Sequence, residues 1–212
     1  MIETRLKHLY AQLFEHFGHR NWWPAGSPFE VCVGAILTQN TSWRNVEKAI
    51  SNLKSDDRLD PFKLYEMPLG ALAALIKPAG YFNVKSKRLR NFISYLVERH
   101  EGSLDRMFEA PISALRTELL SINGIGRETA DSMILYAANK PIFVIDVYTR
   151  RVLERHGIIG SKFDYDEIRK LFERSLEPDV ALFNDFHAQF VAVGSNYCGR
   201  KPKCSGCPLD GF

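Results

Sequence analysis

The tetrapeptide Asn123-Gly124-Ile125-Gly126 is the feature that most constrains the fold of this chain. Two glycines that flank one aliphatic residue permit a left-handed turn that a side chain would block. Apolar residues on both sides predict that the turn joins two helices packed face to face. The second helix would expose the backbone N–H groups of Ile125, Gly126 and Arg127, and such donors at a helix N-terminus bind phosphate. An ordinary packing corner between helices is the alternative interpretation.

The composition is that of a globular protein with a mildly basic character. The chain has 212 residues, of which 45% are hydrophobic and 25% charged, and its net charge is +3. This length suffices for one large domain or two small lobes, each with its own core. The charge permits DNA binding without indicating it. Because no apolar run could span a membrane and no signal-like segment opens the chain, we expect a soluble cytoplasmic protein, associated with the nucleoid if it binds DNA.

Apolar residues recur at helical spacing through most of the chain, which predicts an all-α fold. Residues 29–37 are apolar almost all round and predict a buried helix. Thr41 is the expected N-cap of the next helix, and the outer face of a later helix would carry Lys85, Lys87, Arg88 and Arg90. The principal predicted helices span residues 2–17, 29–37, 43–53, 84–100, 112–120, 165–176 and 180–193.

The motif GIGRETA, followed by Asp146 at the head of a further helix, resembles the helix-hairpin-helix DNA glycosylase superfamily, to which endonuclease III belongs. The resemblance implies a two-lobed all-α fold. A central helical barrel would span residues 28–138, with the hairpin at 119–138, and residues 1–27 would pack beside 139–212 as the second lobe. Sequence patterning alone would not join the two ends of the chain.

Asp146 is the first candidate for a catalytic residue. Hydrolysis of an N-glycosidic bond passes through an oxocarbenium-like sugar, which a nearby carboxylate stabilises while it orients or activates water. In the resembled superfamily an aspartate in this VDxxxxRV context has that role. The alternative is that Asp146 only caps the helix that begins at Val147. The two roles can coexist.

Glu128 departs from the pattern of the bifunctional, endonuclease-III-type enzymes. Those enzymes have a lysine two residues after the second glycine, whose amine forms a Schiff base with the sugar and then eliminates the strand. Glutamate cannot form an imine, so strand cleavage by this route is not expected. A first-turn acid favoured by the helix dipole is the structural alternative for Glu128.

Three tryptophans, Trp22, Trp23 and Trp43, are candidates for the pocket of a flipped base. Alkylated purines are cationic, so electron-rich indoles attract them, by about 2 kcal/mol when desolvated. The alternative is that the tryptophans fill the core. Together, WWP, LTQNT followed by an aromatic, PAGYFNVKSKRL and GIGRETA resemble the endonuclease-III-like 3-methyladenine DNA glycosylases. That resemblance places the three tryptophans, with Glu128, around the base.

Gln39 and Asn40 lie in a polar break between two predicted helices. In the resembled enzymes this loop enters the duplex where the nucleotide has left it, and the amide of Gln39 could hydrogen-bond the orphan base. An ordinary polar inter-helix loop is the alternative. The hairpin residues Gly124, Ile125, Gly126, Arg127 and Thr129 would contact phosphates.

Cys198, Cys204 and Cys207 crowd the end of the sequence and indicate metal ligands rather than disulfides. Endonuclease III binds a [4Fe–4S] cluster through cysteines spaced C-x6-C-x2-C-x5-C. Here the first gap is x5 and the second x2, and a fourth cysteine would fall at the next position after Phe212. The resemblance therefore implies a [4Fe–4S] cluster with three ligands visible, while zinc, an external fourth ligand or loss of the cluster stay open.

The sequence thus predicts a monomeric DNA glycosylase of base excision repair that acts on double-stranded DNA with a damaged base. We expect a monofunctional enzyme that removes alkylated purines such as 3-methyladenine. One alternative is an endonuclease-III-like enzyme acting on oxidised or mismatched pyrimidines, which would prefer a lysine at position 128. The other is a non-catalytic helix-hairpin-helix module, which would have no use for Asp146.

Overall fold

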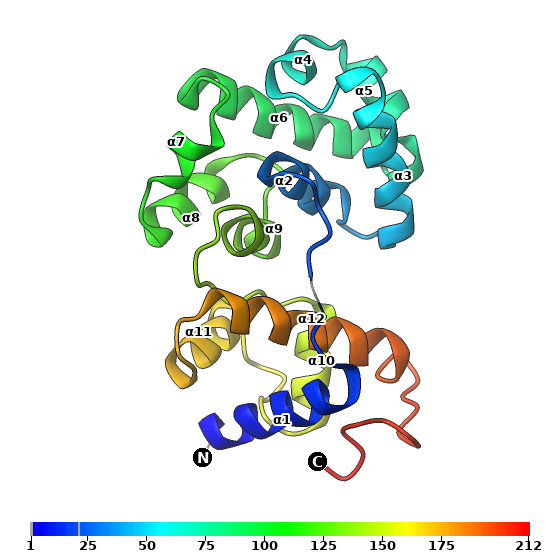
Figure 1. Ribbon diagram of the computed structural model, residues 1–212, viewed down its shortest axis with the longest axis vertical. Helices are drawn as coiled ribbons and strands as arrows, with labels where there is room; N and C mark the ends of the chain where they lie inside the picture. Colours follow the sequence, from blue (N-terminus) through cyan, green and yellow to red (C-terminus); the bar gives the residue numbers. More distant parts are fainter. Residues whose placement is uncertain (1, 21) are drawn as a thin grey trace. The chain divides into compact units, whose positions relative to one another are not determined.

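The computed structural model describes residues 2–20 and 22–212, and its secondary structure is helical with no strand in that part of the chain. The all-α prediction is confirmed. The chain forms two compact units, which Figure 1 draws together. We call residues 25–138 the hairpin unit, and residues 1–24 with 139–212 the terminal unit. Positions 1 and 21 of the predicted second lobe lie outside the described residues. None of the described helices is both long and apolar enough to cross a lipid bilayer.

The hairpin unit contains the greater number of helices. In chain order they are α2 (Pro28–Leu37), α3 (Trp43–Lys54), the 3-10 turn Ser55–Asp57, α4 (Pro61–Glu66), α5 (Leu69–Leu75), the 3-10 turn Lys77–Ala79, α6 (Phe82–His100), α7 (Leu104–Phe108), α8 (Ile112–Ser121), α9 (Arg127–Ser132) and the π-helical segment Met133–Ala137.

Helix α2 is central in the hairpin unit, where it contacts α3, α6, α9 and the π-helical segment. Every residue from Phe29 to Leu37 is buried, which confirms the predicted buried helix. The one carboxylate among them, Glu30, accepts a hydrogen bond from Gly26 N at 2.9 Å and pairs with Lys54 Nζ at 2.7 Å. These partners compensate the cost of burying its charge.

Lys85 does not lie on the outer face of its helix, and that prediction is wrong. Its side chain is 1% exposed, and its Nζ donates hydrogen bonds to Leu37 O and Ala79 O, both at 2.8 Å. Burial, with a smaller effect of Arg88, lowers the Lys85 pKa to about 8. Arg90, also predicted on the outer face, donates to the carbonyls of Tyr65 and Met67. Both cations satisfy carbonyls at helix ends, which lack partners within their own helix.

Two further local predictions need correction. Ser42, not Thr41, is the N-cap residue of α3, and its side chain makes no capping hydrogen bond. The helix after the hairpin turn is not a regular α-helix through Ala138, because it widens into a π-helical segment that Ala138 N closes on Met133 O at 2.9 Å. A π turn rotates the residues that follow it, and such turns occur often at functional sites.

The terminal unit joins both ends of the chain. Its helices are α1 (Ile2–Phe17), α10 (Val147–Arg155), α11 (Tyr165–Ser175) and α12 (Val180–Asn196). Helix α12 packs on α1 and α10, and Arg5 of α1 donates to His156 O at 2.7 Å. The approach of α10 to α12 depends on Gly194, because a Cβ there would lie 2.4 Å from Cδ1 of Tyr148.

We therefore expect Gly194→Ala to destabilise the protein by about 1–3 kcal/mol, since the added methyl overpacks the α10–α12 contact. Gly70→Ala in α5 is the matched control, because a Cβ there meets nothing within 4 Å. Removing a glycine from a helix interior raises stability by about 0.5–1 kcal/mol. Urea unfolding of both variants measures the difference between their stabilities. Equal unfolding midpoints would show that α10 and α12 tolerate a Cβ at position 194.

Candidate DNA interface and catalytic carboxylate

The predicted hairpin turn is present between α8 and α9. Gly124 has a φ of +102°, which is the conformation that requires glycine, and Gly126 is the N-cap of α9. Gly126 and Arg127 are exposed. Ile125 differs from the prediction, because its side chain is buried and its N–H closes the turn on Ile122 O at 3.0 Å. Ile125 therefore anchors the turn, and Gly126 and Arg127 face solvent at the start of the helix.

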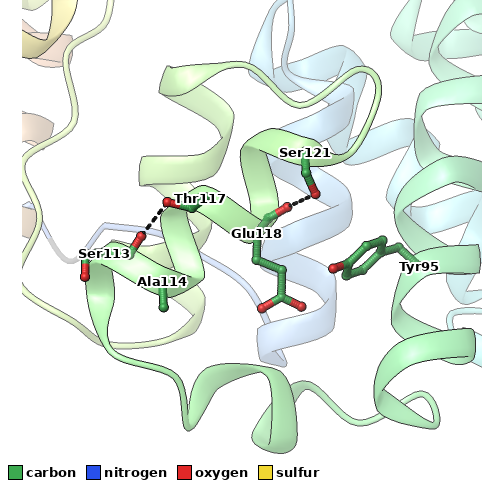
Figure 2. A pocket seen from close by; sticks show the side chains of 6 residues that line it. All are labelled: Tyr95, Ser113, Ala114, Thr117, Glu118 and Ser121. Atoms are coloured by element: carbon green, nitrogen blue, oxygen red, sulfur yellow. Dashed lines mark hydrogen bonds between the residues drawn. The ribbon is translucent and has the colours of Figure 1, made fainter.

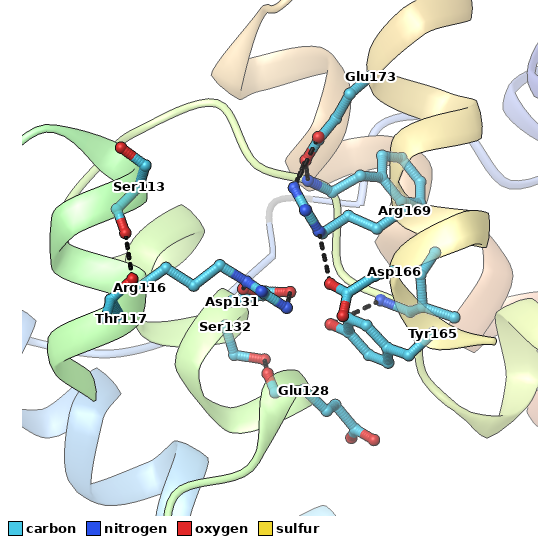
Figure 3. Close-up of polar contacts among 12 residues, drawn as sticks. Ser113, Arg116, Thr117, Glu128, Asp131, Ser132, Tyr165, Asp166, Arg169 and Glu173 are labelled. Atoms are coloured by element: carbon cyan, nitrogen blue, oxygen red, sulfur yellow. Dashed lines mark hydrogen bonds and ion pairs between the residues drawn. The ribbon is translucent and has the colours of Figure 1, made fainter. Parts of the chain in front are cut away.

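A buried ion pair joins the two helices of the hairpin, as Figure 3 shows. Arg116 Nε of α8 lies 2.7 Å from Asp131 Oδ1 of α9, and its second nitrogen, NH2, lies 3.3 Å from Oδ2. The Asp131 side chain is fully buried. Such a two-point contact fixes orientation as well as distance. The pair therefore holds the two helices in register on both sides of the turn.

Gln39, in loop 38–41, contacts the hairpin directly. Its Nε2 donates to Gly124 O at 3.1 Å and to Thr129 Oγ1 at 3.0 Å. Arg88 of α6 donates to its Oε1. Asn40, the next residue, is exposed and has a left-handed φ of +54°. The structure thus brings Gln39, Gly124 and Thr129, all predicted DNA-binding residues, into one hydrogen-bonded cluster.

Asp146 lies in the terminal unit, where it is the N-cap of α10. Its Oδ1 accepts a hydrogen bond from Thr149 N at 2.7 Å, so the capping role is confirmed. Its Oδ2 lies 3.6 Å from His187 Nε2 of α12, which is a charge contact too long for a good hydrogen bond. The Asp146 side chain is 11% exposed and that of His187 is 7% exposed. One carboxylate oxygen therefore binds the helix, and the other lies beside an imidazole.

The surroundings keep Asp146 ionised. Burial alone would raise the pKa of this carboxyl, but the His187 imidazole and the hydrogen bond from Thr149 outweigh burial, so the pKa lies below its ordinary value of 3.8. At neutral pH the site therefore contains a carboxylate that is nearly dry and negatively charged. Such a group stabilises a developing positive charge more strongly than it would in water.

Helix α11 supports the extended segment that leads into Asp146 (Figure 3). Phe143 N donates to Glu173 Oε1 at 3.2 Å, and Ile145 N donates to the Tyr165 hydroxyl at 3.4 Å. Glu173 is in turn paired with Arg169 at 2.7 Å. The backbone N–H groups of Phe143 and Ile145 thus bond to side chains of α11.

The residues of the predicted base pocket belong to both units. Trp22 and Trp23 are half-buried in the terminal unit, with ring centroids 5.9 Å apart in an edge-to-face arrangement. Trp43, half-buried, is the first residue of α3 in the hairpin unit. Glu128 is exposed in the first turn of α9. None of the three tryptophans is fully buried.

The three cysteines line a single cavity of about 400 Å³ in the terminal unit. Cys198 is buried, and its sulfur accepts a hydrogen bond from Arg155 at 3.1 Å. The pKa of Cys207 is raised, mainly by burial and also by the nearby Cys198 and Cys204. Across residues 2–20 and 22–212, however, no three Cys, His, Asp or Glu side chains are close enough together to hold a metal ion. The three donors are of the kind that holds an iron–sulfur cluster, because thiolates are its usual ligands.

A second cavity, of about 540 Å³, lies in the hairpin unit and opens widely to solvent. Figure 2 shows Tyr95 of α6 facing Glu118 of α8 across it. Glu118 also pairs with His100. The remaining lining residues are Ser113, Ala114, Thr117 and Ser121, so none of the predicted site residues takes part.

Sequence reasoning did not single out two residues whose position in the structure is unusual. His187 lies far from Asp146 along the chain, and no motif or spacing connects them. Tyr81 is 73% exposed, with a left-handed φ of +45°, at the N-cap of α6. Non-glycine residues in this conformation are uncommon and cluster at functional sites.

The family model of the HhH-GPD superfamily of base excision DNA repair proteins matches residues 33–178, which include the hairpin and Asp146. The chain belongs to this superfamily. It is a helix-hairpin-helix DNA glycosylase of base excision repair, as the sequence predicted. It is 46% identical to an assigned DNA repair glycosylase of Methanocaldococcus jannaschii, over 96% of this chain and 93% of the relative.

Two solved structures place the glycosylase among its relatives. A non-covalent endonuclease III–DNA complex matches with a TM-score of 0.83 at 21% identity, over 98% of this chain and 92% of that one, which shows the shared fold. The 3-methyladenine DNA glycosylase of H. pylori, bound to 1,N6-ethenoadenine, matches with a TM-score of 0.72 at 28% identity, over 92% and 95% of the two chains.

The electrostatics of this glycosylase predict that the pKa of Asp146 is lower than that of a free aspartate and depends on His187. We expect carboxyl ¹³C NMR to give a value below 3.8 in the native protein. In His187→Phe the value should rise, because burial then acts with only the Thr149 contact opposing it. Because the pKa of Asp146 is lower in the folded state than in the unfolded state, its ionisation stabilises the fold. This stabilisation is complete above the unfolded-state pKa and is lost as the pH falls through the folded-state pKa. A value unchanged in His187→Phe would show that the imidazole does not act on this carboxylate.

Proposed function

We propose that the enzyme is a monofunctional glycosylase that hydrolyses the N-glycosidic bond of alkylated purines such as 3-methyladenine. The observation that carries the proposal is the Asp146 carboxylate, which is 11% exposed yet held in its charged form by His187 and Thr149. Capping α10 uses only one carboxylate oxygen, and a non-catalytic clamp has no use for the second oxygen buried beside an imidazole. Perturbed pKa values of this kind are typical of catalytic sites.

Asp146 has two tasks in the proposed reaction. As the bond between C1′ and the base nitrogen breaks, its electron pair stays with the base, and positive charge develops on the sugar. The carboxylate stabilises this charge, and water then adds to C1′ with its oxygen while the carboxylate or solvent takes its proton. A cationic alkylated purine leaves as a neutral base, so no strong general acid is required.

Glu128 supports the absence of lyase chemistry. It occupies the position at which bifunctional enzymes carry the Schiff-base lysine, and its carboxylate is not a nucleophile that forms an imine. With water as the nucleophile, the product is an intact strand with an abasic site.

The tryptophans and a relative support the assignment to purines. The half-buried tryptophans Trp22, Trp23 and Trp43 carry the electron-rich rings that attract a flat, cationic base. The H. pylori 3-methyladenine glycosylase, 28% identical to this chain, is bound to a purine adduct in its structure. We propose that these tryptophans, with Glu128, contact the flipped base.

The proposed substrate is double-stranded DNA with a damaged base, bound by a monomer. The exposed hairpin residues Gly126 and Arg127, anchored by Ile125, would contact the backbone, and loop 38–41 would act at the lesion. Thr129, predicted to share this role, is buried and binds Gln39 instead. Exposed Gly126 and Arg127 at the start of α9 support the phosphate role.

An assay on duplex DNA treated with a methylating agent tests the activity. We expect release of 3-methyladenine, resolved by chromatography, with strand nicks only after hot alkali, because water rather than an amine attacks the sugar. Uracil- and thymine-glycol-containing duplexes are the controls, and their release should be weak, since a neutral base gains no cation–π attraction. Efficient release of those pyrimidines, or nicking without alkali, would favour an endonuclease-III-like activity.

We further propose that the cysteine cavity is a structural iron–sulfur site in which Cys198, Cys204 and Cys207 supply thiolates, with no step of the reaction assigned to it. The purified protein should then contain iron and acid-labile sulfide. Cys204→Ser, at an exposed position of the cavity, should lose both and unfold at a lower temperature. Zinc in place of iron, or no bound metal in either protein, would contradict this proposal.

A further inference from the structure

We infer that Gln39 and Arg88 form a bracket that fastens loop 38–41 to the hairpin turn, so that Asn40 is the side chain this loop presents to DNA. The inference concerns the hairpin unit alone and rests on the proposed DNA-binding role of the loop and hairpin. It revises the expectation that Gln39 itself enters the duplex.

The chemistry of its partners fixes the orientation of the Gln39 amide. Gly124 O can only accept a hydrogen bond, so the Gln39 Nε2, 3.1 Å away, must face it. The Arg88 guanidinium can only donate, so the Oε1 must face Arg88. Thr129 Oγ1, 3.0 Å from Nε2, completes the set. Both ends of the amide are thus engaged within the protein, and entry into a duplex would break all of these contacts.

Arg88 reaches Gln39 by lying against the hairpin turn. A Cβ built on Gly124 would lie 2.3 Å from Arg88 Cγ and 2.8 Å from its Cβ. Gly124 is therefore required twice, once for its φ of +102° and once for the close approach of the arginine stem. The contact of the stem with the turn and the hydrogen bond to Gln39 together direct the guanidinium toward the loop.

Side chains on one face of helix α6 bind both loop 38–41 and the hairpin turn. Three residues before Arg88, Lys85 Nζ binds Leu37 O at 2.8 Å, at the last residue of α2 before the loop. Three residues after it, Asn91 Nδ2 binds Asn123 O at 2.9 Å in the hairpin turn. Side chains at this spacing lie along one side of a helix. The loop and the turn are therefore held by the same rigid element.

Asn40 is what this arrangement leaves exposed. It follows the bracketed residue directly, has a left-handed φ of +54° and faces solvent. Its short amide offers two donors and an acceptor, which suits any base edge. Because the neighbouring Gln39 is tied down, the position of Asn40 is set before DNA arrives, which lowers the ordering cost of binding.

Urea unfolding without DNA tests the bracket. In a double-mutant cycle, Gln39→Ala and Arg88→Ala should be non-additive, with a coupling of about tenfold in the unfolding equilibrium constant. Arg99, an exposed arginine of the same helix, is the matched control, and Arg99→Ala should be additive with Gln39→Ala. Additive effects of Gln39→Ala and Arg88→Ala would overturn the bracket.

Binding to a duplex that contains a tetrahydrofuran abasic analogue tests the consequence. Asn40→Ala should weaken binding about tenfold, as should Arg88→Ala, while the salt dependence of Arg88→Ala should equal that of the native protein. A direct phosphate contact by Arg88 would instead reduce the salt slope by about one. A reduced slope, or a loss confined to Gln39→Ala, would overturn the assignment. If the native protein bound no duplex, the proposed function would fail, and the unfolding cycle would still decide the bracket.

Discussion

The charge of the Asp146 carboxylate is the constraint on which the proposed chemistry of this glycosylase depends. A carboxylate with little exposure normally gains a proton, since burial disfavours its anion. Here Oδ1 binds Thr149 N at 2.7 Å and Oδ2 faces His187 Nε2 at 3.6 Å, so both oxygens are compensated. The helix cap fixes where the charge lies, and the imidazole helps to keep it charged. Helix α11 holds the preceding segment through Glu173 and Tyr165.

In the hairpin unit, too, the candidate functional residues are held in place by hydrogen bonds and ion pairs from neighbouring side chains. Loops that bind ligands are usually the least ordered parts of a fold, and rigid elements must hold them. Here α6 holds loop 38–41 and the hairpin turn through Lys85, Arg88 and Asn91, and the Arg116–Asp131 pair holds the hairpin helices. The residues expected at the DNA surface are therefore organised by side chains that do not themselves reach it.

The helices and the cap at Asp146 could be predicted because their signals are local. Apolar periodicity identified the buried α2, and an aspartate before an amphipathic segment identified the start of α10. The inward position of Lys85 could not be predicted, because a buried cation is costly unless acceptors are ready, and its acceptors Leu37 O and Ala79 O come from other elements.

The same reason explains the other omissions. His187 reaches Asp146 only because α12 packs on α10, and that packing depends on the missing side chain of Gly194. Gln39 could be recognised as a loop amide, but its partners Gly124, Thr129 and Arg88 come from distant segments. Residue type and spacing thus indicate which side chains are candidates for the chemistry, whereas tertiary contacts determine which of them act on one another.

The replacement Asp146→Asn tests the central claim most directly. Asparagine caps helices as well as aspartate does, so the fold and the Thr149 contact should persist while the charge is lost. We expect base release under single-turnover conditions to fall about 10²–10³-fold, with unchanged affinity for a duplex that contains an abasic analogue. Base release at the native rate would show that the charge of Asp146 does not drive cleavage, and would contradict the account.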